Sequence, residues 1–141
     1  MASYSFIHAA DLHLDSPFKG LKRVSPQIAE ELRKSTFEAF NAVLDLCIAE
    51  HVDALLIAGD IFDSADQSLL AQLTFVDGLK RLESEGIRSF VCHGNHDPLD
   101  AWRSEIPFPE NTFRFGETVV SSELRPSDPD SPLVYGFSYP T

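Results

Sequence analysis

The sequence predicts an α/β fold with a central parallel sheet and flanking helices. Three short hydrophobic runs, at residues 4–10, 53–58 and 87–92, have the length and content of buried strands. Two longer segments with helical spacing of apolar residues separate these runs. The order strand–helix–strand–helix–strand gives a parallel sheet with right-handed crossovers. The 141 residues fit a single domain by length.

The first helix and the second strand have clear local signals. Ser25-Pro26 offers an N-cap and a proline at the first helical position, and apolar residues at helical spacing extend this helix to about His51. The second strand is apolar on consecutive positions, which predicts helices over both faces of the sheet. After Pro98, prolines separate short strand-like segments at residues 112–115, 118–121 and 133–137.

The second helix is predicted from a capping signal and an apolar stripe. Residues 64–67 have capping-box spacing, and Gly86 is placed to end the helix. The stripe consists of residues at helical spacing, Leu69, Leu73, Val76 and Leu79.

The chain is strongly acidic, with a formal net charge of −11. A free-standing DNA-binding module normally has a basic surface, so this charge argues against one. No stretch has the length of a membrane span, and the N-terminus lacks the basic region of a signal peptide. Cys47 and Cys92 lie in apolar stretches, as reduced thiols do in cytoplasmic proteins. We therefore expect a cytoplasmic protein without membrane association.

A polar cluster follows each of the first two strands directly. In Asp11-Leu12-His13, residues two apart on an extended segment point to the same side, so a carboxylate and an imidazole can reach one ion. In Gly59-Asp60 the glycine permits a tight turn while the aspartate projects from the end of the strand. A carboxylate has two oxygens and can bridge two cations about 3.5–4 Å apart. Each cluster alone is also compatible with a turn or helix cap.

The third cluster, Gly94-Asn95-His96-Asp97, is the most specific of the three. The oxygen of Asn95 can ligate a metal, His96 can donate or accept a proton, and Asp97 could orient the imidazole. Open α/β sheets build their ligand sites at the carboxyl ends of the strands. Carboxylate, imidazole and amide groups together suit manganese, iron or zinc. Three such clusters at equivalent strand ends favour metal-assisted hydrolysis over three unrelated structural roles.

These clusters resemble the first three motifs of the calcineurin-like metallophosphoesterases. The segment from Phe6 to Phe18 is similar to the SbcD-type DNA-repair exonuclease branch, in particular to its YhaO-like bacterial members. The resemblance runs from about Phe6 to Asp97 and more faintly to Tyr135-Gly136-Phe137. It implies a β-sandwich core with four α/β/β/α layers in the complete catalytic domain.

The resemblance also implies roles for the polar residues. Asp11, His13 and Asp60 would bind one metal ion, and Asp60 and Asn95 would bind a second one, with Asp60 as the bridge. His96 would protonate the leaving oxygen or steady the phosphate, and Asp97 would support His96. Two manganese ions are the cofactors that this branch implies.

Two features depart from the family pattern. Many nucleases of this branch carry a histidine where Asp63 stands, so the resemblance assigns Asp63 no clear role. The family also supplies three further histidines, whereas every histidine of this chain lies at or before position 96. We therefore expect residues 1–141 to be the N-terminal part of one catalytic domain, with an incomplete second metal site and no activity of their own.

The leading functional hypothesis is a DNA exonuclease of the SbcD-like repair type with a two-metal mechanism. Its expected partners are DNA and an SbcC-like coiled-coil ATPase, and a second copy of the chain in a homodimer is a further candidate. One alternative is a nucleotide or small-molecule phosphodiesterase of the same superfamily. Another is a non-catalytic scaffold, which would typically have lost motif residues that are all present here.

Several other residues have weaker claims to function. His8 is expected to be a hydrogen-bonded core histidine rather than a metal ligand, and His93 to be structural or exposed. Lys19, Lys22 and Arg23 follow the first cluster, where they suit either phosphate contacts or a solvated loop. Trp102 and Phe108 suit either a substrate groove or ordinary packing.

Overall fold

The computed structural model describes residues 3–18, 20, 23–63, 67–99 and 106–141. Its centre is a sheet of four parallel strands in the order β1-β2-β3-β4. The strands are β1 (Phe6–Ala9), β2 (Ala54–Ala58), β3 (Arg88–Cys92) and β4 (Thr112–Arg114). The register pairs Ile7 with Leu55 and Leu55 with Ser89. The predicted α/β fold with a parallel sheet is confirmed.

Two helices connect the first three strands, α2 (Pro26–Ala49) and α3 (Leu69–Ser84). Ser25 caps α2 by accepting a hydrogen bond from the backbone N–H of Ile28, as its sequence predicted. The cap of α3 is Ser68, whose hydroxyl accepts from the backbone N–H of Ala71. Of the expected capping box, residues 64–66 lie outside the described part of the chain. Because Ser68 is the N-cap, α3 begins at Leu69, which is later than the capping-box spacing at residues 64–67 suggested.

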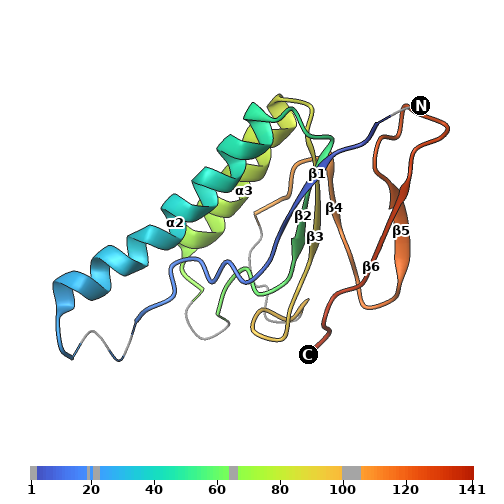
Figure 1. The fold of residues 1–141 in the computed structure, drawn as a ribbon. Helices are drawn as coiled ribbons and strands as arrows, with labels where there is room; N and C mark the ends of the chain where they lie inside the picture. Colours follow the sequence, from blue (N-terminus) through green and yellow to red (C-terminus); the bar gives the residue numbers. More distant parts are fainter. Residues whose placement is uncertain (1–2, 19, 21–22, 64–66, 100–105) are drawn as a thin grey trace.

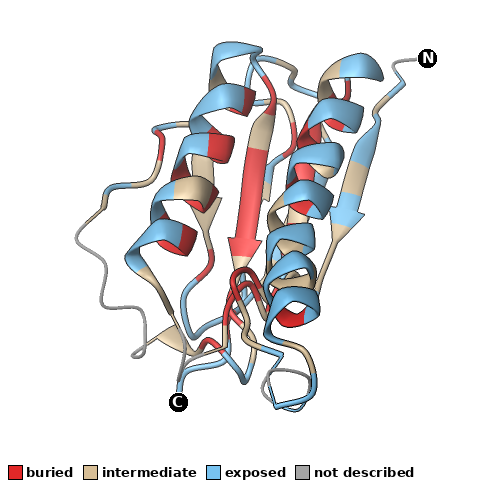
Figure 2. Ribbon diagram, turned by 90° about the vertical axis from the view of Figure 1, so that its left-hand side faces the viewer, coloured by how far each residue is buried: buried red, intermediate tan, exposed pale blue. Residues whose placement is uncertain are grey.

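Both helices pack on the same face of the sheet (Figure 1). Their buried residues run along the sides that face each other and the sheet (Figure 2). This core joins fully buried aromatic and aliphatic side chains, among them Phe40, Leu44, Leu55, Phe75 and Leu79. The rings of Phe40 and Phe75 stack with centroids 5.6 Å apart, which joins the two helices.

Within the described part of the chain, an antiparallel hairpin and no helix lies over the other face of the sheet. The hairpin consists of β5 (Val120–Glu123) and β6 (Leu133–Gly136) and lies opposite α2 and α3 (Figure 1). A second apolar cluster lies here, made of Ala54, Phe90, Phe115 and Leu124. The expectation of helices on both faces is therefore wrong. A continuous apolar run requires burial on both faces, and Phe115, Leu124 and Val134 contribute it on this face in place of a helix.

The loops that follow β1, β2 and β3 gather at one end of the sheet (Figure 1). Because the strands are parallel, their carboxyl ends share that edge, and this is where the three polar clusters lie. Among the described residues no helix is long and apolar enough to cross a membrane.

Candidate metal centre

The loop after β1 runs beside the loop after β2 and continues the pairing of the two strands. Backbone N–H groups of Asp11 and His13 donate to the carbonyls of Gly59 and Asp60, at 3.2 and 3.1 Å. This places the first two predicted ligands next to the third.

The backbone of this region adopts a conformation that few residues tolerate. Asp11, His13 and Asp60 have φ values of 54°, 42° and 51°, in the left-handed region. Each such residue costs on the order of 1–3 kcal/mol and persists only where its surroundings hold it. All three residues of the cluster have this strained backbone conformation, and such strain is typical of functional sites.

Asp11, His13 and Asp60 form a group that fits a divalent metal ion. Each offers one ligand atom, and these atoms lie within 4.8 Å of one another. The Nε2 atom of His13 is 3.9 Å from Oδ1 of Asp11. Asp11 is exposed and the other two are half-buried. Two carboxylates and an imidazole, open to solvent on one side, are a suitable donor set for a transition metal that also binds water or substrate.

Asp63 fixes the orientation of the His13 ring. Its Oδ1 is 3.0 Å from Nδ1 of His13, and its other oxygen accepts a hydrogen bond from the Ser16 hydroxyl. Partial burial opposes ionisation, but these hydrogen bonds outweigh it and lower the pKa of the Asp63 carboxyl. With Nδ1–H donating to Asp63, the lone pair of Nε2 is available to a metal. Asp63, to which the family resemblance assigned no clear role, thus belongs to the site.

The third loop meets the cluster at Asp60. A Cβ atom on Gly94 would collide with the carboxylate of Asp60 and lie 2.7 Å from its backbone nitrogen. The backbone N–H of His96 donates to Oδ1 of Asp60 at 3.0 Å. Asn95, an exposed residue, lies between these two contacts. The structure therefore brings the Asn95 segment to Asp60, the residue expected to share both ions.

The imidazole of His96 lies beside the cluster. Its Nδ1 atom is 3.4 Å from Oδ1 of Asp63, and its ring meets that of His13 edge to face at 5.4 Å between centroids. About half of the side chain is exposed. It is Asp63 that lies next to this imidazole, and not Asp97 as expected.

Asp97 has a different position from the expected one. It is buried, and its carboxylate accepts hydrogen bonds from the backbone N–H groups of Asp60, Ile61 and Gly94 at 2.8–3.0 Å. Burial raises the pKa of Asp97 to about 6, although the three backbone hydrogen bonds oppose this shift. Asp97 joins the second and third loops from beneath the cluster.

The other histidines near the sheet are not in the cluster. His93 is buried, and its Nδ1 lies 3.0 Å from the carbonyl of Asp97 while Nε2 accepts from Arg114 at 2.8 Å. It is structural, as expected. His8 was expected in the core, but it is exposed on the hairpin side of β1. An edge strand has only one neighbour, so its side chains on that face are less covered.

The remaining candidates have mixed outcomes. Lys19, Lys22 and Trp102 lie outside the described residues. Phe108 packs against the main core with its ring 6.2 Å from that of Phe75. Two buried residues that support the loops were missed: Asp15 below the first loop, and Ser138, which accepts from the N–H of His93 at 2.9 Å. Asp15 lies within the Phe6–Phe18 segment that carries the family resemblance, but nothing there assigned it a role, and Ser138 stands in no motif.

The chain is similar to several curated proteins. It is 40% identical over 140 residues to the uncharacterized metallophosphoesterase YhaO of Bacillus subtilis, which is 99% of this chain and 34% of YhaO. It is 31% identical over 97 residues to the DNA double-strand break repair protein Mre11 of Sulfurisphaera tokodaii, covering 69% of the chain and 23% of that protein. Identity to the SbcD component of the Bacillus subtilis nuclease SbcCD is 31% over 102 residues, 72% of the chain and 24% of that component. The chain therefore spans about a third or less of these relatives.

The family comparison agrees with the geometry of the site. The family model of the calcineurin-like phosphoesterases matches residues 4–137, which include every strand and both helices described above. Such enzymes hydrolyse phosphoesters with divalent metals, and the donor set of Asp11, His13 and Asp60 is of that kind. The chain belongs to the calcineurin-like phosphoesterase family.

Proposed function

We propose that this chain is part of a metal-dependent phosphodiesterase that acts on DNA, of the SbcD-like exonuclease type. The observation that carries the proposal is the convergence of Asp11, His13 and Asp60 within 4.8 Å, with His96 beside them, at the carboxyl ends of three parallel strands. The similarity to a component of the SbcCD nuclease and to Mre11 repair proteins favours DNA as the substrate.

Asp11, His13 and Asp60 would hold one ion, and Asp60 and Asn95 would contribute to a second. Bound ions would supply Lewis-acid stabilisation of the negative charge that develops on the phosphoryl oxygens. We propose manganese because the donor set mixes imidazole with carboxylate and amide oxygens. Three histidines of the family pattern have no counterpart in these 141 residues. We infer that the second ion needs ligands that these residues do not supply.

His96 is the group that would handle a proton. Its half-exposed imidazole is 3.4 Å from the Asp63 carboxylate, which would hold the orientation of the ring. A protonated imidazole in this place can donate to the leaving oxygen of a phosphodiester. Asp63 thereby serves two rings, since the same oxygen accepts from His13.

A nucleotide phosphodiesterase is the second candidate, and the net charge of −11 favours it. An acidic protein repels a DNA backbone unless cations or a basic partner offset its charge. For the DNA enzyme we propose that an SbcC-like ATPase supplies part of the DNA contact. A scaffold role fits less well, because the cluster and His96 are intact.

The test is an assay of the product of the whole gene that encodes this chain. Purified protein with Mn²⁺ is given linear duplex DNA, closed circular DNA, cyclic nucleotides and a chromogenic phosphodiester. We expect degradation from the ends of linear DNA, no loss of the circle, and abolition by EDTA. Hydrolysis of nucleotide esters without DNA cleavage would establish the second candidate. Inactivity on all four substrates, with and without an SbcC-like partner, would support the non-catalytic scaffold role.

A further inference from the structure

Asp15 is a buried carboxylate that the metal cluster does not use. It follows His13 by two positions, is 3% exposed, and has a φ of 64°. A buried carboxylate is very unfavourable unless it is paired and hydrogen-bonded. Its partners therefore indicate what it does.

The side chain and backbone of Asp15 are attached to both helices. Arg33 of α2 donates through Nε to Oδ1 at 2.5 Å and through Nη2 to Oδ2 at 2.9 Å. Ser68, the N-cap of α3, donates its hydroxyl to Oδ2. The backbone N–H of Asp15 donates to the Thr36 hydroxyl oxygen at 3.1 Å. We name these residues, Asp15, Arg33, Thr36 and Ser68, the helix clamp.

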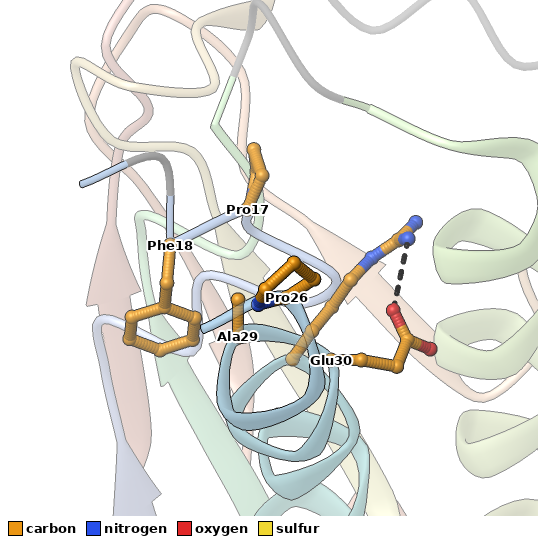
Figure 3. A pocket seen from close by; sticks show the side chains of 6 residues that line it. Pro17, Phe18, Pro26, Ala29 and Glu30 are labelled. Atoms are coloured by element: carbon orange, nitrogen blue, oxygen red, sulfur yellow. Dashed lines mark ion pairs between the residues drawn. The ribbon is translucent and has the colours of Figure 1, made fainter. Parts of the chain in front are cut away.

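The outer side of the helix clamp lies at the surface. Directly after Asp15 and Ser16, the chain forms a small cleft that is lined by Pro17 and Phe18 and, from α2, by Pro26 and Glu30 (Figure 3). Arg33 also lines this cleft, and its Nη1 is 3.8 Å from the Glu30 carboxylate. The guanidinium is thus held between two carboxylates, and its planar fork fixes the direction in which it meets Asp15.

The loop from Asp11 to Ser16 needs such an attachment. Asp11, His13 and Asp15 are all left-handed, a conformation that local preference does not maintain. At its inner side the loop is held by backbone hydrogen bonds to residues 59–61. The helix clamp holds its outer end and resists a return of these residues to ordinary backbone angles.

We propose that Asp15 is a positioning residue of the metal centre, which through Arg33, Thr36 and Ser68 keeps Asp11 and His13 in the geometry that binds the ion. The inference rests on the proposed function, because it concerns the same metal. Loss of an outer-shell contact of a metal site typically lowers affinity 10–100-fold. Asp15 acts through the backbone, so we expect about a tenfold loss.

The experiment measures Mn²⁺ affinity by calorimetric titration, and amide hydrogen exchange of the metal-free protein, in the product of the whole gene. The variants are Asp15→Asn, Arg33→Lys and Thr36→Val, so that a folding failure of one leaves the others. Val76→Ala, which truncates a fully buried side chain of α3 outside the clamp, is the control for general destabilisation. Arg81→Gln is the control for an ion pair between the helices, since Arg81 pairs with Asp45 at 2.6 Å.

For Asp15→Asn and Thr36→Val we expect about tenfold weaker Mn²⁺ binding and faster exchange of the His13 and Leu14 amides, with slow exchange retained in α3. Arg33→Lys should fall between these and the wild type, because lysine keeps the charge but not the fork. Affinity within twofold of the wild type in both Asp15→Asn and Thr36→Val would overturn the inference, as would an equal loss in Val76→Ala. A wild-type protein that binds no Mn²⁺ would instead refute the proposed metal centre itself.

Discussion

Asp60, in the loop after β2, contacts both of the other loops of the site. Its carbonyl accepts from the N–H of His13, its own N–H donates to Asp97, and its Oδ1 accepts from the N–H of His96. Two of these three contacts use backbone atoms, so they do not depend on the side-chain charge. The carboxylate can therefore be changed with little effect on the fold.

Asp60→Asn should abolish hydrolysis while leaving the fold intact, because it weakens the side chain that we propose is shared by both ions. Activity is measured in saturating Mn²⁺, and thermal unfolding checks the fold. Asp77→Asn, the same chemical change at an exposed position of α3, is the matched control. Near-normal turnover of Asp60→Asn would show that Asp60 does not bridge two ions.

His96→Ala should behave differently, because it removes a proton-handling group and leaves the cluster of Asp11, His13 and Asp60 in place. A loss of about 10²–10⁴-fold in turnover is typical of such a group. Calorimetric titration should show Mn²⁺ affinity little changed. A variant that loses the metal together with activity would show that His96 is a ligand.

The buried imidazole of His93 makes stability depend on pH. Burial, aided by the positive charge of Arg114, lowers the pKa of His93 from 6.5 to about 4. Between these values the unfolded chain binds a proton at this position and the folded chain does not, so acid favours unfolding. The contribution of His93 is present above pH 6.5 and is lost as the pH falls towards 4, by on the order of 3 kcal/mol.

The measurement is the difference in unfolding free energy between wild type and His93→Gln, by urea denaturation at several pH values from 7.5 to 4.5. The pKa of Asp97 is raised to about 6, so that this residue acts with the opposite sign, but it is present in both proteins. We expect the stability of the wild type relative to the variant to decline steadily below pH 6.5. A difference that does not vary with pH would contradict a neutral, buried His93.

At the scale of elements, the loops after β2 and β3 pack backbone against backbone. A Cβ on Gly59 would lie 2.9 Å from Cα of Gly94, and Gly59 has a φ of 82° that favours glycine. Gly94 in turn lies against Asp60. Close approach of the two loops therefore requires both glycines, which explains why each stands at the start of a polar cluster.

Gly94→Ala should destabilise the protein by about 1–3 kcal/mol, since the added methyl group meets backbone atoms that cannot move aside cheaply. It should also weaken metal binding, because Asp60 must shift. Gly116→Ala is the control, since its Cβ would meet nothing within 4 Å. Equal unfolding free energies of these two variants would show that the loops can separate without cost.

The sequence predicted the strands, the connecting helices and the convergence of the clusters, because these follow from hydrophobic periodicity and from the parallel order of strands. It misplaced what depends on tertiary packing. Leu69 and Leu73 were assigned to the buried stripe of α3, but both are exposed, and Ala71, Phe75 and Leu82 are buried instead. The first turn of α3 packs on the main core through Ala71 and not through Leu69, so helical spacing alone did not identify its buried side.

In the site, too, the sequence predicted local features but not those that depend on tertiary contacts. Motif spacing found the cluster, but the roles of Asp15, Asp63 and Asp97 depend on which donors surround each carboxylate. Left-handed residues in the first loop turn the chain at each step. The rule that residues two apart share one side of a strand therefore does not extend past Ala10, and it could not predict that Asp15 turns towards the helices.

At the scale of the whole molecule, the two faces of the sheet differ in coverage. The helix side is closed, whereas on the hairpin side Phe6 and His8 of β1 are exposed. Apolar residues of the hairpin and the segment after it are also exposed, among them Val120, Leu133, Tyr135 and Phe137. The loop that carries Asp11 and His13 is hydrogen-bonded to residues 59–61 and to Thr36 of α2, so these ligands are held whether or not the hairpin side is covered.

These properties lead to a prediction for the 141 residues taken alone. The first site has three candidate ligands, Asp11, His13 and Asp60, and for the second the sequence offers only Asp60 and Asn95. A catalytic transition-metal site generally needs at least three protein ligands with positions open for water and substrate. We expect at most one Mn²⁺ per monomer, bound weakly. We expect no DNA cleavage, because the second ion lacks ligands and a two-ion site cannot assemble.

Calorimetric titration measures the stoichiometry of Mn²⁺ binding, and analytical ultracentrifugation measures the oligomeric state. Asp11→Asn is the matched variant, which should lose the first metal site. Robust Mn²⁺-dependent cleavage by a strictly monomeric preparation would contradict this, whereas cleavage by a dimer alone would show that a second copy supplies the missing ligands.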